Sequence, residues 1–354
     1  MSIERTTTLG SSTSMLNYIK SGESNYYKLA EEASSGLKLT TPSDNPTGAR
    51  TVMNINTKLS QLTSYSDNMS LAQNELDVLD NTFTSINDSI QSASDLATQA
   101  SNGTYSSTDL NNIKTQINQI MANVTDLANT QYNGNYIFSG TSTSTPAYKI
   151  VTDASGSITS ATYQGTPSTG DYQRSVQISD GVSIPINTTG DQVFGSYSNT
   201  SATAAAVAGD VDGTTTTTTN GITTSVTIKL DGAGNKTTTT QTGSGLLYTL
   251  GTLSTALGKA DTTAVASSLD SLSNNSDTIL ASQTQFASVS QRFVITQSAN
   301  DTMTTQLKSS RSDLQDADLS QVLTDLTAQQ TALQATMSVT STLLNGVTLL
   351  DYIK

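Results

Sequence analysis

The chain carries an apolar heptad stripe near each of its ends. Between Asp316 and Lys354, apolar and uncharged residues follow one another at alternating spacings of four and three, and these are Leu319, Leu323, Leu326, Gln330, Leu333, Met337, Thr340, Leu344 and Val347. Near the other end the same alternation links Met15, Ile19, Gly22, Tyr26, Leu29 and Ala33. This spacing places each set along one side of an α-helix, in the a/d pattern of a coiled coil. The chain therefore has a one-sided helix near each end that needs a partner.

Two explanations of these stripes remain open, because an isolated helix with one apolar side is only marginally stable in water. In the first, the two end helices pack on each other as a hairpin inside one monomer. In the second, which we favour, both ends stay disordered until neighbouring copies supply the missing surface. The second hypothesis defines an assembly seam made of Met15, Ile19, Tyr26, Leu29, Leu319, Leu323, Leu326, Leu333, Met337, Leu344 and Val347.

Composition narrows the possible functions. The chain has 354 residues, a net charge of −13, and neither histidine nor cysteine. An acidic chain has no basic surface to neutralise phosphates, so nucleic acids and anionic membrane surfaces are poor partners. Without His and Cys, the usual ligands of zinc, copper and haem and the commonest general base are missing. We therefore expect a protein that is not an enzyme and that holds no metal or cofactor.

The sequence contains no targeting or membrane segment of the common kinds. Residues Met1 to Lys20 have neither an apolar central region nor a small-residue cleavage site, so they are not a Sec signal peptide. No stretch approaches 18 consecutive apolar residues, so no membrane insertion is expected. If the protein leaves the cell, another route must carry it.

The first part of the chain is predicted to be helical. A helix from about Ser11 to Ser35 ends at Gly36, and a polar connector leads to Asn45 and Pro46, which read as the N-cap and first residue of the next helix. That helix continues to about Ala100, and a shorter one runs from Thr108 to about Thr130.

The middle of the chain is predicted to form short β-strands. Of the 23 glycines, 17 lie between Gly134 and Gly258, and alternation with a period of two replaces the heptads. Val176, Ile178, Val182, Ile184 and Ile186 alternate on either side of Asp180-Gly181, a hairpin turn dipeptide. Two threonine runs, 214–219 and 237–240, favour extended backbone because threonine is β-branched.

The helical pattern returns after about Leu247 and includes a long run from Thr263 to Ser310. The predicted fold is therefore α+β: a long antiparallel helical bundle or coiled coil built from both chain ends, with a small inserted β domain. We expect terminal assembly helices at 1–45 and 315–354, a helical rod domain at 46–145 and 245–314, and the inserted β domain at 146–244. The acidic pair Asp316 and Asp318 suits the N-terminus of the last helix.

Two segments carry a family resemblance. Residues Leu29 to Ala49, in which Ser35-Gly36-Leu37 ends one helix and Asp44-Asn45-Pro46 opens the next, resemble the N-terminal pattern of the bacterial flagellin superfamily. Asn133 to Thr141 is similar to a segment of the flagellar hook–filament junction proteins, the hook-associated protein 3 family, as is the ending Thr348 to Lys354. The resemblance covers about residues 1–145 and 245–354, and the central part matches loosely through Gly181–Ile186 and Gly190–Phe194.

The resemblance implies a structural role outside the cell. Proteins of this family leave the cell unfolded through the flagellar type III export apparatus, and their terminal helices order when subunits assemble into a tube. The implied partners are other copies of the chain, the first hook-associated protein, flagellin and a flagellar export chaperone. Two alternatives remain: a flagellin or minor flagellin of the filament, and a threonine-rich surface adhesin whose middle domain binds a ligand.

Overall fold

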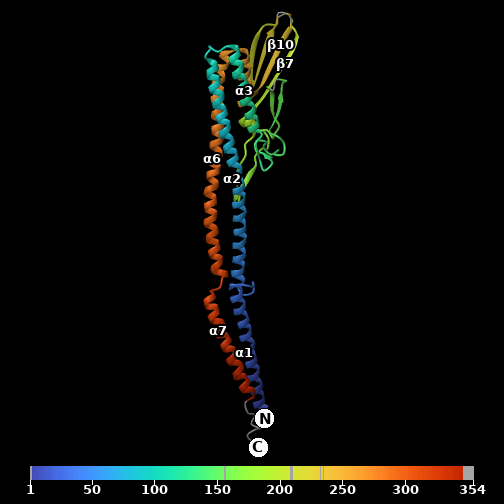
Figure 1. Ribbon diagram of the computed structural model, residues 1–354. Helices are drawn as coiled ribbons and strands as arrows, with labels where there is room; N and C mark the ends of the chain where they lie inside the picture. The colour runs from blue at the N-terminus through green and yellow to red at the C-terminus, as the bar shows by residue number, and fades with distance from the viewer. Residues whose placement is uncertain (1, 155–156, 208–209, 232, 234, 346–354) are drawn as a thin grey trace. The chain divides into compact units, whose positions relative to one another are not determined.

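The computed structural model describes residues 2–154, 157–207, 210–231, 233 and 235–345 (Figure 1). In chain order, the elements are α1 (Ser2–Ser35), α2 (Pro46–Ser101), α3 (Ser107–Ala128), β1 (Gln131–Tyr132), β2 (Asn135–Tyr136), β3 (Tyr148–Thr152), β4 (Ile158–Tyr163), β5 (Ser175–Ser179), β6 (Val182–Pro185), α4 (Gly190–Val193), β7 (Ser196–Ala205), β8 (Gly213–Thr219), β9 (Ile222–Leu230), β10 (Asn235–Ser244), α5 (Gly245–Lys259), α6 (Thr262–Gln315) and α7 (Leu319–Asn345). Long helices from both chain ends with an inserted antiparallel sheet confirm the predicted α+β class.

The chain divides into two compact units, residues 1–63 with 299–354 and residues 64–298. Their boundaries lie inside α2 and α6 rather than at the ends of predicted segments. The division into terminal helices, rod and inserted β domain stays a prediction. We describe each unit by itself.

In the first unit, local signals in the sequence set the helix ends. Gly36 follows α1 with a φ of 70°, the left-handed conformation that glycine adopts at a helix C-terminus. Asn45 caps α2 as predicted, because its Oδ1 accepts a hydrogen bond from the backbone N–H of Gly48 at 2.9 Å. The helix α1 begins at Ser2, earlier than the predicted start near Ser11.

In the second unit, α2 and α6 lie side by side and bury a continuous apolar stripe (Figure 1). The predicted stripe of α2 is buried throughout: Leu76, Leu79, Phe83, Ile86, Ile90, Ala93, Ala97 and Ala100. Phe83 stacks on Phe286 of α6 with 6.2 Å between ring centroids and meets the edge of Phe138 at 6.0 Å. Helix α3 joins the same core through Ile113 and Ile117 and packs on α5.

The inserted section forms a six-stranded antiparallel sheet in the order β3-β4-β7-β10-β9-β8, and β5 and β6 form a separate hairpin at the predicted Asp180-Gly181 turn. Helix α5 packs on β7 and β10. There, the Nε2 of Gln241 donates a hydrogen bond to the hydroxyl of Thr255 at 2.7 Å. A Cβ on Gly251 would lie 2.3 Å from the ring of Tyr197, so only glycine permits this helix to approach the sheet so closely.

The threonine runs lie in β8 and β10, and three strands of the sheet are longer than the short strands predicted. β7 and β10 have 10 residues each and β9 has 9. Threonine hydroxyls pair across the strands, as between Thr214 and Thr227 and between Thr218 and Thr223, both at 3.0 Å. Such cross-strand pairs stabilise a sheet that has little apolar core beneath it.

Candidate assembly surface

The two terminal helices pack on each other within the first unit, α1 against α7 (Figure 1). On α1, one side is half-buried and consists of the predicted stripe: Met15, Ile19, Gly22, Tyr26, Leu29 and Ala33. Leu16 and Tyr27 on one flank of this stripe and Tyr18 on the other are exposed by 54%, 70% and 69%. In the structure this stripe of α1 therefore packs on α7 within the monomer, as in the helical-hairpin explanation.

The α1–α7 contact is close at Gly22. A Cβ at this position would lie 3.1 Å from Cδ1 of Leu333, so the missing side chain lets the helices approach. The Nε2 of Gln329 donates a hydrogen bond to the carbonyl oxygen of Gly22 at 3.2 Å. A polar residue thus occupies the interface without leaving its amide unpaired.

On α7, the packed side differs from the predicted stripe. The residues that are buried or half-buried are Val322, Leu326, Gln329, Leu333, Thr336 and Thr340. Only Leu326, Leu333 and Thr340 of the prediction belong to this set, because an α-helix has about 3.6 residues per turn and the apolar residues of α7 spread over two adjoining sides. At three positions the residue just before the predicted one lies on the packed side: Val322 in place of Leu323, Gln329 in place of Gln330 and Thr336 in place of Met337.

The remaining predicted residues of α7 therefore stay exposed. Leu319, Leu323 and Met337 are 47%, 53% and 42% exposed, and the predicted position Gln330 is exposed too. The Leu344 side chain, Val347 and the segment Thr348 to Lys354 lie outside the described residues. The assembly seam stays a prediction at these positions, where the structure leaves the side chains exposed instead of packing them on α1.

We call the exposed apolar residues of the two helices the terminal surface: Leu16, Tyr18, Tyr27, Leu319, Leu323, Met337 and Val339. Exposed large apolar side chains on both helices make this surface the candidate for binding other proteins. The surface combines a part of the predicted seam with α1 residues that the heptad count did not include. Sequence reasoning missed the latter because Leu16, Tyr18 and Tyr27 lie outside the four-three spacing.

The two connectors that precede α2 and α7 meet at one level in the first unit. The backbone N–H of Lys38 donates to the carbonyl of Gln315 at 2.7 Å, and the N–H of Ala317 donates to the carbonyl of Gly36 at 2.9 Å. Leu37 and Asp316 form an isolated antiparallel bridge. The two connectors therefore interrupt the helices at the same level of the unit.

Acidic residues fix the ends of these connectors. Asp318 Oδ1 accepts hydrogen bonds from the backbone N–H groups of Ser320 and Gln321, which supports its predicted place at the N-terminus of α7. Hydrogen bonds from the hydroxyl and backbone N–H of Thr41, and then the charge of Lys28, lower the pKa of Asp44 below its usual value. These contacts are solvent-exposed and define local turns rather than a chemical site.

Within the described residues, no group of three His, Cys, Asp or Glu side chains lies where it could hold a metal ion. In the same ranges, no helix is both long enough and apolar enough to cross a membrane. The exposed apolar residues of the terminal surface offer area for association with another protein.

Comparison with known proteins confirms the resemblance over the first part of the chain. A family model described as the bacterial flagellin N-terminal helical region matches residues 7–143. This range contains both segments that carried the resemblance there, Leu29 to Ala49 and Asn133 to Thr141. No curated protein matches the whole chain or any part of it in sequence.

Solved structures show the same fold. A Vibrio parahaemolyticus protein described as a flagellar hook-associated protein has a TM-score of 0.56 at 17% identity, over 77% of this chain and 100% of that chain. Flagellar hook-associated protein 3 of Legionella pneumophila has a TM-score of 0.54 at 16% identity, over 74% and 98% of the two chains. A structure described as the flagellar junction protein of the same species gives 0.51 at 15% identity, over 75% and 99%. At these identities the likeness establishes the fold.

Proposed function

We propose that this chain is a structural subunit of the bacterial flagellum that forms the junction between the hook-associated proteins and the flagellin filament. The observation that carries the proposal is the likeness in fold to hook-associated and junction proteins over almost their whole length. The match of residues 7–143 to the flagellin N-terminal region supports a place in the flagellum. No catalytic step belongs to this role.

Self-assembly through the terminal helices is the mechanism we propose. The terminal surface presents apolar side chains from both α1 and α7, and a neighbouring copy with the same surface buries them. Because α1 and α7 of one copy already pack as a pair, the assembling element is a helical hairpin rather than a single helix.

The monomer's hairpin is weakly held. Among the described side chains of α1 and α7, only Val322 and Thr340 are buried, at 7% and 8% exposure. The second unit, in contrast, buries aromatic and aliphatic side chains almost completely. Terminal segments that order fully only in the assembly agree with export of an unfolded chain through the flagellar type III apparatus, which is part of this proposal.

The proposed partners follow from the position at the junction. They are other copies of the chain, the first hook-associated protein on the hook side, flagellin on the filament side, and an export chaperone before assembly. The proposed location is the extracellular flagellum.

A filament subunit, flagellin or a minor flagellin, is the second candidate, because the matched family model is that of the flagellin N-terminal region. Deleting the gene separates the two. Loss of a junction subunit leaves hooks in place while flagellin accumulates in the medium. Loss of a filament subunit instead shortens or removes filaments without releasing flagellin, and that result would overturn the junction assignment.

A further inference from the structure

The strand β8 (Gly213–Thr219) lies at one edge of the six-stranded sheet. Among the described strands it pairs only with β9, and all seven of its residues are exposed. One side of its backbone therefore presents amide and carbonyl groups to the solvent. An open edge of this kind is a template on which another β-strand can pair.

The two edges of the sheet differ in how they are protected. At the opposite edge, β3 is five residues long, carries the exposed cation of Lys149, and has an irregular register between Val151 and Thr152. A charge and a bulge are common devices that prevent pairing at an edge. The strand β8 has neither, because it consists of one glycine and six threonines and its register with β9 is regular throughout. Of these two edges, β8 is the one that is open for pairing.

The hairpin turn determines which residues of β8 face the open edge. Asn220-Gly221 is a two-residue turn, so Thr219 and Ile222 beside it form a hydrogen-bonded pair. Hydrogen-bonded and non-bonded pairs alternate along an antiparallel ladder, so every second residue of β8, counted back from Thr219, bonds to β9. The residues between them direct their N–H and C=O groups toward the open edge. These residues are Thr214, Thr216 and Thr218.

The side chains of β8 agree with this assignment. Residues of a non-bonded pair lie closer together than those of a bonded pair, at about 4.5 Å between Cα atoms. The hydroxyls of Thr214 and Thr218 lie 3.0 Å from those of the residues opposite them on β9, Thr227 and Thr223. These are the pairs that the alternation assigns as non-bonded. The same positions therefore combine open backbone groups with hydroxyls on one face of the sheet.

We propose that β8 pairs with β8 of a second copy of this chain, antiparallel and centred on Thr216. This register sets Thr216 opposite itself and Thr214 opposite Thr218. All three outward-facing residues of each strand then lie in hydrogen-bonded pairs. In the next paragraphs we call this contact the β8 pair.

The second copy is the partner because β8 is complementary to itself. Residues 214–219 are all threonine, so the strand reads the same in both directions and every pair within this run sets threonine opposite threonine. Such pairs already stabilise the β8–β9 hairpin through their hydroxyls. The same register sets Asp212 opposite Asn220 of the second copy, so no like charges face each other.

The β8 pair has two-fold symmetry, so it closes at two copies and does not propagate. It thereby differs from the proposed contact at the terminal surface and goes beyond the proposed function. One pair of short strands is small beside the roughly 1,000 Å² that a stable interface buries, so we expect a weak and reversible dimer.

Disulfide trapping in the purified full-length chain tests the β8 pair, and the chain contains no cysteine that would interfere. In Thr216→Cys the two cysteines lie opposite each other, at about 5.5 Å between Cα atoms, a separation that a disulfide spans. The matched controls are Thr214→Cys and Thr218→Cys, which are equally exposed and lie on the same face. In each control the two identical positions lie more than about 13 Å apart along the strands.

We expect Thr216→Cys to give at least tenfold more covalent dimer than either control alone. Mixing Thr214→Cys with Thr218→Cys should raise their yield at least fivefold at the same total concentration, because these positions face each other in the β8 pair. Equal yields from Thr216→Cys and the controls would overturn the proposal. More dimer from Thr214→Cys alone would also overturn it, because that result requires another register.

A backbone substitution tests the pairing without moving the cysteines. Added to the mixed pair of variants, Thr216→Pro removes an N–H that faces the open edge, where an edge strand tolerates proline. We expect it to lower the yield of covalent dimer at least tenfold. Thr216→Val keeps the N–H and the shape of the side chain and should leave the yield within twofold. Equal yields from the proline and valine variants would contradict backbone pairing, and neither result depends on whether the chain belongs to a flagellum.

Discussion

The side-chain amide of Gln329 donates a hydrogen bond to the backbone carbonyl of Gly22, 3.2 Å away, across the contact between α1 and α7. The two residues lie 307 positions apart in the chain. Gly22 leaves its carbonyl open to the side chain of Gln329, because a Cβ at this position would lie 3.1 Å from Leu333 Cδ1 and 3.5 Å from Gln329 Nε2. The contact lies on the side of α7 that faces α1, while Leu323 and Met337 stay exposed.

A bulky residue at Gly22 should separate the helices. We expect Gly22→Leu to destabilise the α1–α7 hairpin by about 1–3 kcal/mol, because the new side chain meets Leu333 and displaces Gln329. Protection of α1 in hydrogen exchange measures this effect. Ser24→Leu, at an exposed position of the same helix, is the matched control; an equal loss of protection in both variants would refute the role of close approach.

Charges on the terminal surface should impair assembly and spare the monomer. We expect Leu323→Asp with Met337→Asp to change the free energy of unfolding of the monomer by less than about 0.5 kcal/mol per site, because both side chains are largely exposed. Incorporation into flagella should fall at least tenfold. Ala328→Asp adds a charge at an exposed position of α7 that points away from both Leu323 and Met337, and it should assemble normally. Normal assembly of the double variant would show that this surface has no such role.

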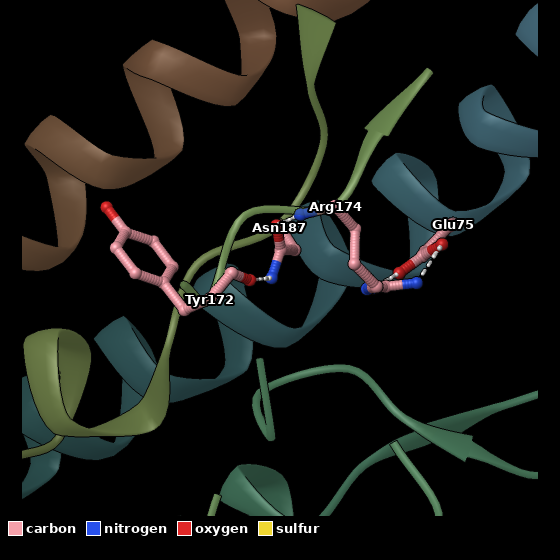
Figure 2. A network of polar contacts seen from close by, with 4 residues as sticks. All are labelled: Glu75, Tyr172, Arg174 and Asn187. Carbon is pink, nitrogen blue, oxygen red and sulfur yellow. Dashed lines mark hydrogen bonds and ion pairs between the residues drawn. The ribbon is translucent and has the colours of Figure 1, made fainter. Parts of the chain in front are cut away.

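The pair of Arg174 and Glu75 should contribute measurably to stability. Their side chains are only 27% and 14% exposed, so Glu75→Gln leaves a largely buried guanidinium without its counter-charge. We expect a loss of about 1–3 kcal/mol in denaturant unfolding. Lys28→Met removes the cation of the more exposed Lys28–Asp44 pair and should cost less than about 1 kcal/mol. Equal costs would mean that the pair of Arg174 and Glu75 in Figure 2 adds nothing to the attachment of the β5–β6 hairpin to α2.

Alkaline pH should destabilise the second unit through its buried tyrosines. Burial, and then the charge of Asp191, raises the pKa of Tyr148 and of Tyr163 well above their usual value of 10.0. Because the folded-state pKa exceeds the unfolded one, the stabilisation is fully present below pH 10.0 and is lost as the pH rises through the folded-state pKa. Thermal unfolding measured from pH 9 upwards should show a falling midpoint that is less steep in Tyr148→Phe. Identical slopes would rule out Tyr148 as a source.

The ends of the soluble monomer should be the first sites of proteolysis. Residues before about Thr40 and after about Asp316 should be cut while the second unit stays intact, because α1 and α7 bury so little surface. Mass spectrometry of a limited digest identifies the cut sites. Protection of both ends in dilute monomer would show that the hairpin is a stable domain in its own right.

Much of the fold follows from local signals in the sequence. Gly36, Asn45 and Asp180-Gly181 act within a few residues of their own positions, and the structure has the helix end, the cap and the turn where these residues predict them. A further local signal was overlooked: Asn220-Gly221 joins β8 and β9 with φ values of 52° and 75°, the turn that an Asn-Gly pair between β-branched runs favours.

Long-range contacts could not be predicted in the same way. The heptad count places Leu319, Leu323 and Met337 on the packed side of α7, but the adjoining side packs instead, and its contacts, such as that of Leu333 with Gly22, come from another helix. The pairing of Arg174 with Glu75 spans 99 positions and follows from how a hairpin docks on α2. Neither contact produces a periodic pattern in the sequence from which it could be predicted.

The proposed place of this protein in the flagellum is tested most directly by electron microscopy of purified flagella labelled with an antibody to the chain. The account predicts label confined to a single short band between the hook and the filament. Label along the whole length of the filament, or none on the flagellum, would contradict it.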